Sequence, residues 1–114
     1  MKQSRVEFLQ GTLDMLVLRT LALGPLHGYG IAQAIRRTTD AALKVEAGSL
    51  YPALQRLELK GLVSARWDVS EHKHRTRIYR LTPAGRRRLR AEMSRWEEFV
   101  RVVSLVLHPK SVEE

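Results

Sequence analysis

Cysteine is absent from the 114-residue sequence, and this absence excludes a disulfide framework, a thiolate nucleophile and a cysteine-based zinc site. Long hydrophobic runs are absent too, because Asp14 and Arg19 interrupt the apolar stretch near the N-terminus. That stretch is too short and too charged to span a membrane, and no small-residue cleavage site follows it. A chain without cysteine is compatible with a reducing compartment, so we expect a cytoplasmic protein with no membrane partner.

The motifs of common enzyme sites are also missing. The stretch GPLHGYG lacks the Lys-Ser/Thr ending and the preceding strand of a phosphate-binding loop, and no Gly-x-Ser-x-Gly nucleophile motif occurs. His72 and His74 are close enough in sequence to share a metal ion, but no third histidine lies beside them, and Glu71 alone does not complete a ligand set. We therefore expect no enzyme activity, no metal and no cofactor.

Acidic residues are few relative to basic ones, and the imbalance is local. The chain has 20 Lys and Arg against 12 Asp and Glu, a net charge of +8. Residues 61–95 alone carry ten basic and three acidic side chains. A charge that served only solubility would be spread evenly, so the concentration favours a polyanionic partner, nucleic acid first and an anionic membrane surface second. Apolar residues make up 44% of the chain, enough for the core of one domain.

Hydrophobic residues recur at helical spacing in three segments of the first half of the chain. A Gly-Pro pair at 24–25 follows the first segment and stops it, because proline cannot continue a helix. The spacing therefore predicts three helices, over about 5–23, 28–38 and 49–60.

The third predicted helix has local signals for its start and its end. Ser49 can cap its N-terminus, Pro52 then falls in the first turn, and Gly61 suits a left-handed position after the last turn. One face carries leucines, and the opposite face carries groups that can bind base edges or phosphates: Ser49, Tyr51, Pro52, Gln55, Arg56 and Lys60. Taken alone, this face is more typical of an ordinary amphipathic helix with a solvated side.

The pattern changes after Gly61. Residues 62–69 and 76–82 alternate between apolar and polar side chains, and they predict two strands joined by a polar loop. Trp67, in the first strand, is expected in the core. The hairpin carries five candidate DNA-binding side chains: His72, Lys73, His74, Arg75 and Arg77. Three helices followed by a basic hairpin are typical of a winged helix-turn-helix, in which one helix enters the major groove and the hairpin contacts the adjacent backbone.

Thr82 and Pro83 predict the start of a last helix, which runs to about residue 107. Its apolar residues are spaced 4, 3, 4, 3 and 4 apart and form a heptad seam: Leu89, Met93, Trp96, Val100, Val103 and Leu107. A helix of this length spans about 37 Å, which is longer than a small domain needs. We expect the seam to form a homodimer interface, to which the first helix contributes; packing on the chain's own first helix is the alternative.

Together these signals predict a mainly α-helical fold with a small β-hairpin. The winged helix-turn-helix domain occupies residues 1–82, a long C-terminal dimerisation helix occupies 83–108, and a disordered tail occupies 109–114. The expected partners are double-stranded DNA and a second copy of the chain, because a two-fold dimer matches a palindromic operator with half-sites about one DNA turn apart.

The stretch GSLYPALQRLELKGLV, followed by a tryptophan, a basic hairpin, YRLTPAG and a second tryptophan, resembles the PadR family of bacterial transcriptional regulators. The resemblance covers about residues 8–107 and is to the subgroup with a single dimerising helix. It implies a winged-helix repressor that binds DNA as a dimer, with Ser49, Tyr51 and Arg56 near the DNA. Many relatives have an uninterrupted run of Arg, Lys and Gly at the wing tip, where this chain has two histidines.

Trp96 has two interpretations. In some multidrug-sensing relatives, aromatic residues on this helix line a site between the subunits, so Trp96 is a candidate for stacking on a small, flat aromatic effector. An ordinary core or interface residue is the alternative. For the whole chain, the alternative function is a winged-helix protein-interaction module without sequence-specific DNA binding, whose outer helix face and wing would lack the cations found here.

Overall fold

The computed structural model describes residues 10–69 and 75–111. Within these ranges the chain forms four helices and a small three-stranded antiparallel sheet, and it is mainly helical, which confirms the predicted fold class. In chain order the elements are α1 (Gln10–Leu21), β1 (Leu26–His27), α2 (Gly28–Thr38), α3 (Ala47–Leu59), β2 (Val63–Val69), β3 (Arg75–Leu81) and α4 (Pro83–Leu107).

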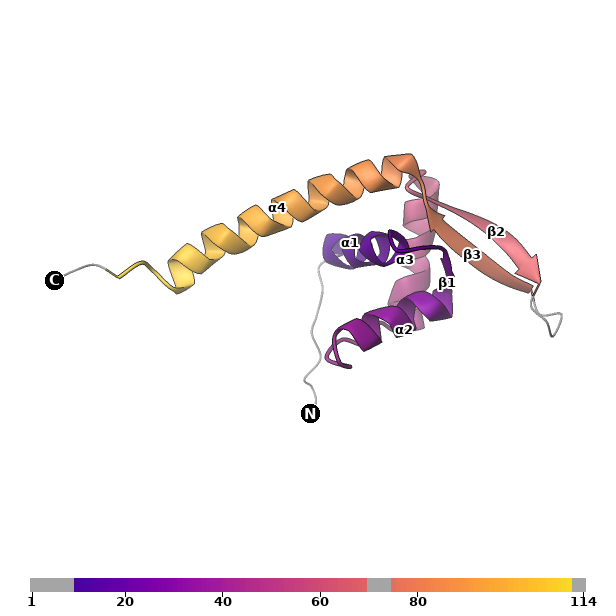
Figure 1. The fold of residues 1–114 in the computed structure, drawn as a ribbon, viewed down its shortest axis with the longest axis horizontal. Helices are drawn as coiled ribbons and strands as arrows, with labels where there is room; N and C mark the ends of the chain where they lie inside the picture. Colours follow the sequence, from indigo (N-terminus) through magenta and orange to yellow (C-terminus); the bar gives the residue numbers. More distant parts are fainter. Residues whose placement is uncertain (1–9, 70–74, 112–114) are drawn as a thin grey trace.

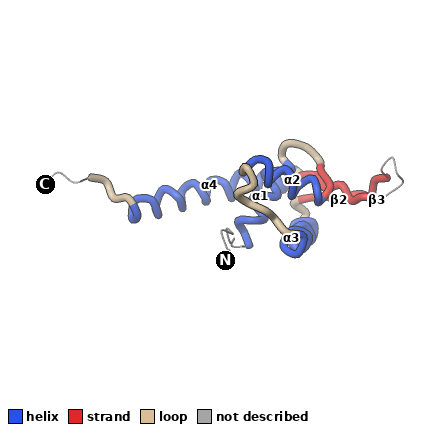
Figure 2. Tube along the Cα trace, turned by 90° about the horizontal axis from the view of Figure 1, so that it is seen from below, coloured by secondary structure: helices blue, strands red, loops and turns tan. Residues whose placement is uncertain are grey.

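The molecule is elongated because its last helix leaves the rest of the fold. Helices α1 to α3 lie together, the β2–β3 hairpin projects from one side, and α4 runs away towards the opposite end (Figure 1). Seen from below, the hairpin and the C-terminal end of α4 lie at opposite ends of a flat particle (Figure 2). The principal-axis extents of 70 × 37 × 20 Å agree with this shape.

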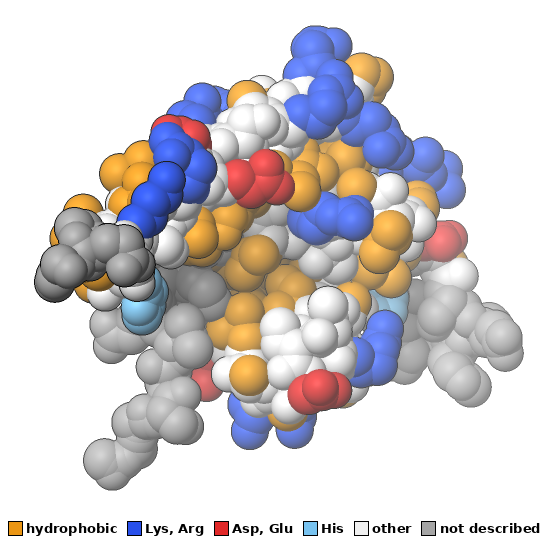
Figure 3. All heavy atoms as spheres, turned by 60° about the vertical axis from the view of Figure 1, so that its left-hand side comes forward, with side chains coloured by type: hydrophobic (Ala, Val, Ile, Leu, Met, Phe, Trp, Pro, Cys, Tyr) orange, Lys and Arg blue, Asp and Glu red, His pale blue; other side chains and the backbone are white. Residues whose placement is uncertain are grey.

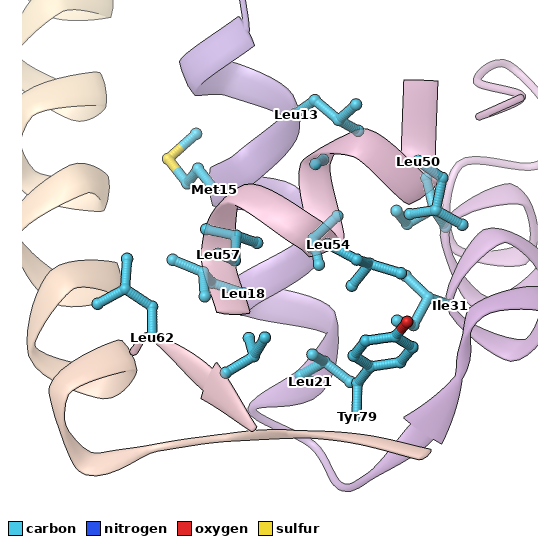
Figure 4. Close-up of a cluster of buried hydrophobic side chains, with 14 of the residues drawn as sticks. Leu13, Met15, Leu18, Leu21, Ile31, Leu50, Leu54, Leu57, Leu62 and Tyr79 are labelled. Atoms are coloured by element: carbon cyan, nitrogen blue, oxygen red, sulfur yellow. The ribbon is translucent and has the colours of Figure 1, made fainter. Parts of the chain in front are cut away.

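One core of mostly aliphatic side chains joins the first three helices to the sheet. Leu18 of α1, Ile31 of α2 and Leu54 of α3 are almost completely buried in it. Tyr79 of β3 extends its ring into the same cluster (Figure 4). Removing a large aliphatic side chain from water contributes about 1.5–3 kcal/mol, so this cluster dominates the stability of the domain and turns the other side of α3 outward.

The first two helices follow the predicted order with different bounds. Helix α1 ends at Leu21, two residues before the predicted end, and the predicted start near residue 5 lies outside the described residues. Helix α2 covers Gly28–Thr38, as predicted.

Strand β1 has no signal in the sequence, because two residues are too few to show alternation. It pairs with β3, which places Leu26 opposite Tyr79 at the edge of the sheet. The next residue, His27, occupies the N-cap position of α2, and its Nδ1 accepts a hydrogen bond from the backbone N–H of Gly30 at 2.9 Å. The short strand therefore ties the start of α2 to the hairpin.

Helix α3 begins two residues earlier than predicted. Its N-cap position is Glu46 and its first residue is Ala47, so the prediction of Ser49 as the cap is wrong. The backbone N–H groups of Ser49 and Leu50 both donate to the Glu46 carbonyl, at 3.0 and 2.9 Å, and close the first turn there. A serine cap is worth only about 1 kcal/mol, little enough for tertiary packing to override. Pro52 consequently lies inside the helix, beyond the first turn.

The end of α3 follows the prediction. Gly61 has a φ of 73°, in the left-handed region that favours glycine. The N–H of Leu62 donates to the Leu57 carbonyl at 2.9 Å, and the N–H of Gly61 donates to the Glu58 carbonyl at 3.0 Å. These are the two hydrogen bonds of a Schellman motif, and they deliver the chain directly into β2.

The start of α4 is fixed to this same turn. As predicted, Thr82 caps the helix: its hydroxyl accepts from the Gly85 N–H at 3.0 Å and donates to the Gly61 carbonyl at 2.8 Å. Gly85 packs so closely that a Cβ at this position would collide with the Leu62 carbonyl oxygen. The base of the hairpin and the first turn of α4 therefore form one rigid junction with the end of α3.

Trp67 lies outside the core, which contradicts the prediction. Val63, at the base of β2, is buried, but Trp67 is 54% exposed. Side chains two and four residues along a strand share one face, so the two residues lie on the same side of the hairpin. The hairpin projects past the helices that cover its base (Figure 1). At Trp67 the described helices therefore no longer cover the inward-facing side of the hairpin.

Candidate nucleic-acid interface

Helix α3 presents an exposed face that holds five of its six predicted recognition residues. Ser49, Tyr51, Pro52, Gln55 and Lys60 are all exposed. The leucines of α3 on the opposite side are buried in the core, which orients this face to the outside. Hydroxyl, amide and ammonium groups are therefore available on one helix for hydrogen bonds to a partner.

Arg56, the sixth predicted recognition residue, lies at one edge of this face and is turned towards α1. Its Nη2 donates to Oδ1 of Asp14 at 2.8 Å, and the two side chains are 30% and 15% exposed. Its Nε atom is buried with no hydrogen-bond partner in the described structure. Arg56 is therefore less available to a partner than the other five predicted residues, because a carboxylate from a distant helix holds its guanidinium.

A second ion pair marks the opposite edge of the α3 face. Nη2 of Arg77, on β3, donates to Oε2 of Glu58 at 2.8 Å. Both side chains are little more than one-third exposed. This pair connects the predicted wing directly to the predicted recognition helix, and the sequence alone does not signal it.

Tyr51 packs across the start of α2 while remaining 47% exposed. A Cβ at Gly28 would lie 2.5–2.8 Å from the ring and hydroxyl of Tyr51, so only glycine leaves room for this arrangement. Beside Tyr51 a hollow of about 360 Å³ opens between the start of α2 and β3, and Arg75 and Arg77 line it. The sequence carries no signal for the contact between Gly28 and Tyr51.

The described part of the wing contains two of its five predicted DNA-binding side chains. Arg75 is exposed and Arg77 is half-buried, whereas His72, Lys73 and His74 lie outside the described residues. The Cζ atoms of Arg75 and Arg77 lie 4.5 and 5.4 Å from the ring centroid of Trp67. Both distances are within the range of cation–π attraction.

Tyr79 links the core to these charges. Burial raises the pKa of its hydroxyl above the ordinary value of 10.0, the Arg77 cation opposes this rise, and the Glu58 carboxylate adds to it. No group of three or more acidic, histidine or cysteine side chains in residues 10–69 and 75–111 is arranged to hold a metal ion. The chemistry that the described surface offers is hydrogen bonding and positive charge.

Helix α4 divides into a packed half and an exposed half. Leu89 is only 6% exposed and belongs to the chain's own core, and Met93 packs against that core. Further along, the exposed apolar side chains include the seam residues Trp96 and Val100 and, beside the seam, Phe99 and Val106. Figure 3, which brings the C-terminal side of the molecule forward, shows hydrophobic patches between Lys and Arg side chains.

The remaining seam residues also lie in the far half of α4. Leu107 is exposed and Val103 is half-buried. The rings of Trp96 and Phe99 lie side by side, with centroids 6.0 Å apart. The seam predicted from heptad spacing thus packs within the chain at Leu89 and Met93, and beyond Met93 three of its four residues are exposed in the described structure.

Comparison with known proteins identifies the family. The model of the transcriptional regulator PadR-like family matches residues 17–91, from within α1 to the first part of α4. The chain belongs to this family. A transcriptional regulator of Mycobacterium tuberculosis is 35% identical to it over 97 residues, which cover 85% of this chain and 87% of that protein.

Solved structures agree with the PadR-like assignment. A PadR family transcriptional regulator from Eggerthella lenta is 35% identical, with a TM-score of 0.76 over 89% of this chain and 86% of that one. A transcriptional regulator from Clostridium thermocellum is 32% identical, with a TM-score of 0.77 over 83% of this chain and 92% of that one. The exposed face of α3 and the arginines of β3 therefore belong to a transcriptional regulator with a winged-helix fold.

Among the described helices, none combines the length and the hydrophobicity that crossing a bilayer requires.

Proposed function

We propose that this PadR-like regulator is a repressor that binds a palindromic DNA operator as a homodimer. The observation that carries the proposal is the side-by-side position of the exposed α3 face and the wing arginines, joined by the Glu58–Arg77 ion pair. A helix of this size fits the major groove, and arginines beside it suit the flanking phosphates. The net charge of +8 favours the same polyanionic partner.

Gln55 and Lys60 have different proposed roles on the α3 face. Gln55 is exposed near the middle of the helix, and a glutamine amide can form two hydrogen bonds with adenine in the major groove. Lys60 is exposed at the end of the helix, where a point charge suits a phosphate. Arg56 stays a candidate DNA contact at the edge of this face, and its guanidinium is already bonded to Asp14 in the free protein.

The experiment is a titration of the protein with the DNA upstream of its own gene and with a shuffled duplex, at two salt concentrations. Preferential binding to the upstream DNA with a steep negative salt slope is expected, since each phosphate contact releases counterions. Gln55→Ala should reduce the preference for the operator by about tenfold, whereas Lys60→Ala should weaken both duplexes by a similar factor. Equal binding to the two duplexes at every salt concentration would contradict the operator proposal and favour an interaction module.

The dimer is proposed to form through the exposed half of α4. Its uncovered apolar side chains lie on a helix that extends beyond the domain, and a two-fold dimer would place two copies of α3 on successive turns of DNA. Contact of this face with a second copy would remove it from water without any change in the fold of the single chain.

A small, flat aromatic effector that releases the DNA is proposed to stack on Trp96. The indole is 44% exposed, and Phe99 beside it widens the aromatic surface. Addition of planar aromatic compounds should quench tryptophan emission in the wild type, and the quenching should be lost in Trp96→Phe, which leaves Trp67 as the only tryptophan. Unchanged quenching in that variant would place the effector elsewhere.

A further inference from the structure

The inward-facing side of the hairpin continues past the core and ends in a cluster of one indole and two guanidinium groups. Trp67 of β2 lies directly opposite Arg77 in the sheet register, and Val69 lies opposite Arg75. Directly opposed residues of antiparallel strands share a face, so Trp67, Arg75 and Arg77 all lie on the side of the sheet that contains buried Tyr79. Arg66, one residue before Trp67, lies on the other side.

Both arginines contact the Trp67 ring, and Arg77 is also held by an ion pair. The Cζ of Arg75 lies 4.5 Å from the Trp67 ring centroid, and that of Arg77 lies 5.4 Å from it. Arg77 also donates to the Glu58 carboxylate of α3 at 2.8 Å. An exposed arginine normally samples many rotamers, and an aromatic face with a carboxylate behind it removes much of that freedom.

The arginines are held at the edge of the hollow that separates the wing from the start of α2. Tyr51, the candidate recognition residue that packs on Gly28, lines the same hollow. Its lining, all within the described residues, includes no Asp or Glu side chain. A space bordered by two guanidinium groups and a phenol hydroxyl suits an oxyanion, and on the proposed partner that oxyanion is a backbone phosphate.

We propose that Trp67 is a positioning residue, whose indole face holds Arg75 and Arg77 over this hollow so that they bind a DNA backbone phosphate at a fixed distance from α3. This inference rests on the proposed DNA-binding function. This role explains why a tryptophan is exposed on β2, a strand whose base, at Val63, is buried in the core. The Glu58–Arg77 ion pair then transmits the position of the wing to the recognition helix.

The first test needs no DNA. In NMR spectra of the free protein, the side-chain Nε–H and Cδ–H protons of Arg75 and Arg77 should show upfield ring-current shifts. Trp67→Leu, which keeps an apolar side chain, should abolish these shifts, and Trp67→Phe should retain a smaller shift. The backbone spectrum of the core should be unchanged in both, since Trp67 is 54% exposed. Arginine protons without ring-current shifts in the wild type would overturn the inference.

The second test measures operator affinity for the same two variants. Trp67→Leu should weaken binding by about fivefold, the factor that corresponds to a cation–π contact of about 1 kcal/mol, while Trp67→Phe should restore most of the loss. Arg75→Gln should lower the magnitude of the salt slope by about one, and Arg66→Gln, the matched charge control on the opposite face of the hairpin, should change it less.

The outcomes separate the two proposals. Equal affinities for Trp67→Leu and the wild type, or equal losses for the leucine and phenylalanine variants, would show that the aromatic face does not position the arginines for DNA. If the wild type binds no DNA, the proposed function fails and the phosphate site fails with it. In that case the ring-current shifts still decide whether Trp67 orders the two arginines.

Discussion

Arg56 shows how a side chain suited to reading bases can serve packing. Its guanidinium bonds to Asp14, which is only 15% exposed, and so α3 is fastened to α1. A carboxylate left without its partner at such a position would lose a charge-assisted hydrogen bond without becoming fully hydrated.

Arg56→Ala is therefore expected to lower the free energy of unfolding by about 1–3 kcal/mol, in addition to any effect on DNA. Urea unfolding followed by circular dichroism measures this, and Asp14→Asn with Arg56→Ala together should cost less than the sum of the two single changes. Full additivity in this double-mutant cycle would mean that the ion pair contributes nothing to stability.

Tyr79 predicts how stability depends on pH in the alkaline range. Burial raises its pKa in the folded state above the ordinary value of 10.0, so the folded protein disfavours the phenolate. The contribution to stability is complete below pH 10 and is lost as the pH rises through the folded-state pKa. Thermal melts between pH 9 and about 11 should show a steeper loss of stability in the wild type than in Tyr79→Phe. Parallel curves for the two proteins would contradict this.

At the scale of single elements, α2 depends on an unusual cap. The Nδ1 of His27 accepts the Gly30 N–H, while β1 pairs the same residue with Ile78 of β3. The histidine thus completes the first turn of α2 and attaches it to the sheet, and Tyr51 of α3 packs across this helix start.

His27→Ala should cost about 1 kcal/mol of unfolding free energy, the usual value of a lost N-cap, and His27→Asn should retain most of it because asparagine is a good cap. Chemical denaturation of the three proteins measures the difference. Gln33→Ala, an exposed substitution on the same helix, serves as the control. An asparagine variant as unstable as the alanine variant would show that strand pairing, and not the cap, is the contribution of His27.

At the scale of the whole molecule, α4 has more apolar surface than the described part of the chain covers. Its first turns pack on the domain through Leu89 and Met93, and its far half carries exposed Trp96, Phe99 and Val100. An exposed apolar patch of this kind on a regular helix is typical of a protein interface, and the proposed occupant is the C-terminal helix of a second copy.

Val100→Asp should convert a dimer into a monomer in sedimentation velocity runs at micromolar concentration, because each interface would bury two carboxylates without partners. The control is Leu59→Asp: Leu59 is 82% exposed at the end of α3 and lies outside the proposed seam. A wild type that sediments as a monomer, or a Val100→Asp variant that remains a dimer, would contradict the seam.

The sequence by itself determined the order of the four helices and the two hairpin strands, the end of α3 and the start of α4. Helical spacing, the Gly61 turn and the Thr82-Pro83 start are all local signals. Each depends on residues that are close in sequence, so it can be recognised without knowledge of the fold. Strand β1 could not be predicted, because two residues show no periodicity. The prediction of Ser49 as the cap of α3 was wrong, because packing outweighs a capping preference of about 1 kcal/mol.

Only the tertiary structure decided which side chains are free to meet a partner. Arg56 and Asp14 are 42 positions apart, so nothing local indicates that one holds the other. Likewise, alternation assigns Trp67 to the inward face of its strand but cannot show that the helices end before they cover it. The residue types of the candidate interface can therefore be read from the sequence. Their exposure and pairing depend on contacts between distant segments, which form only when the core brings those segments together.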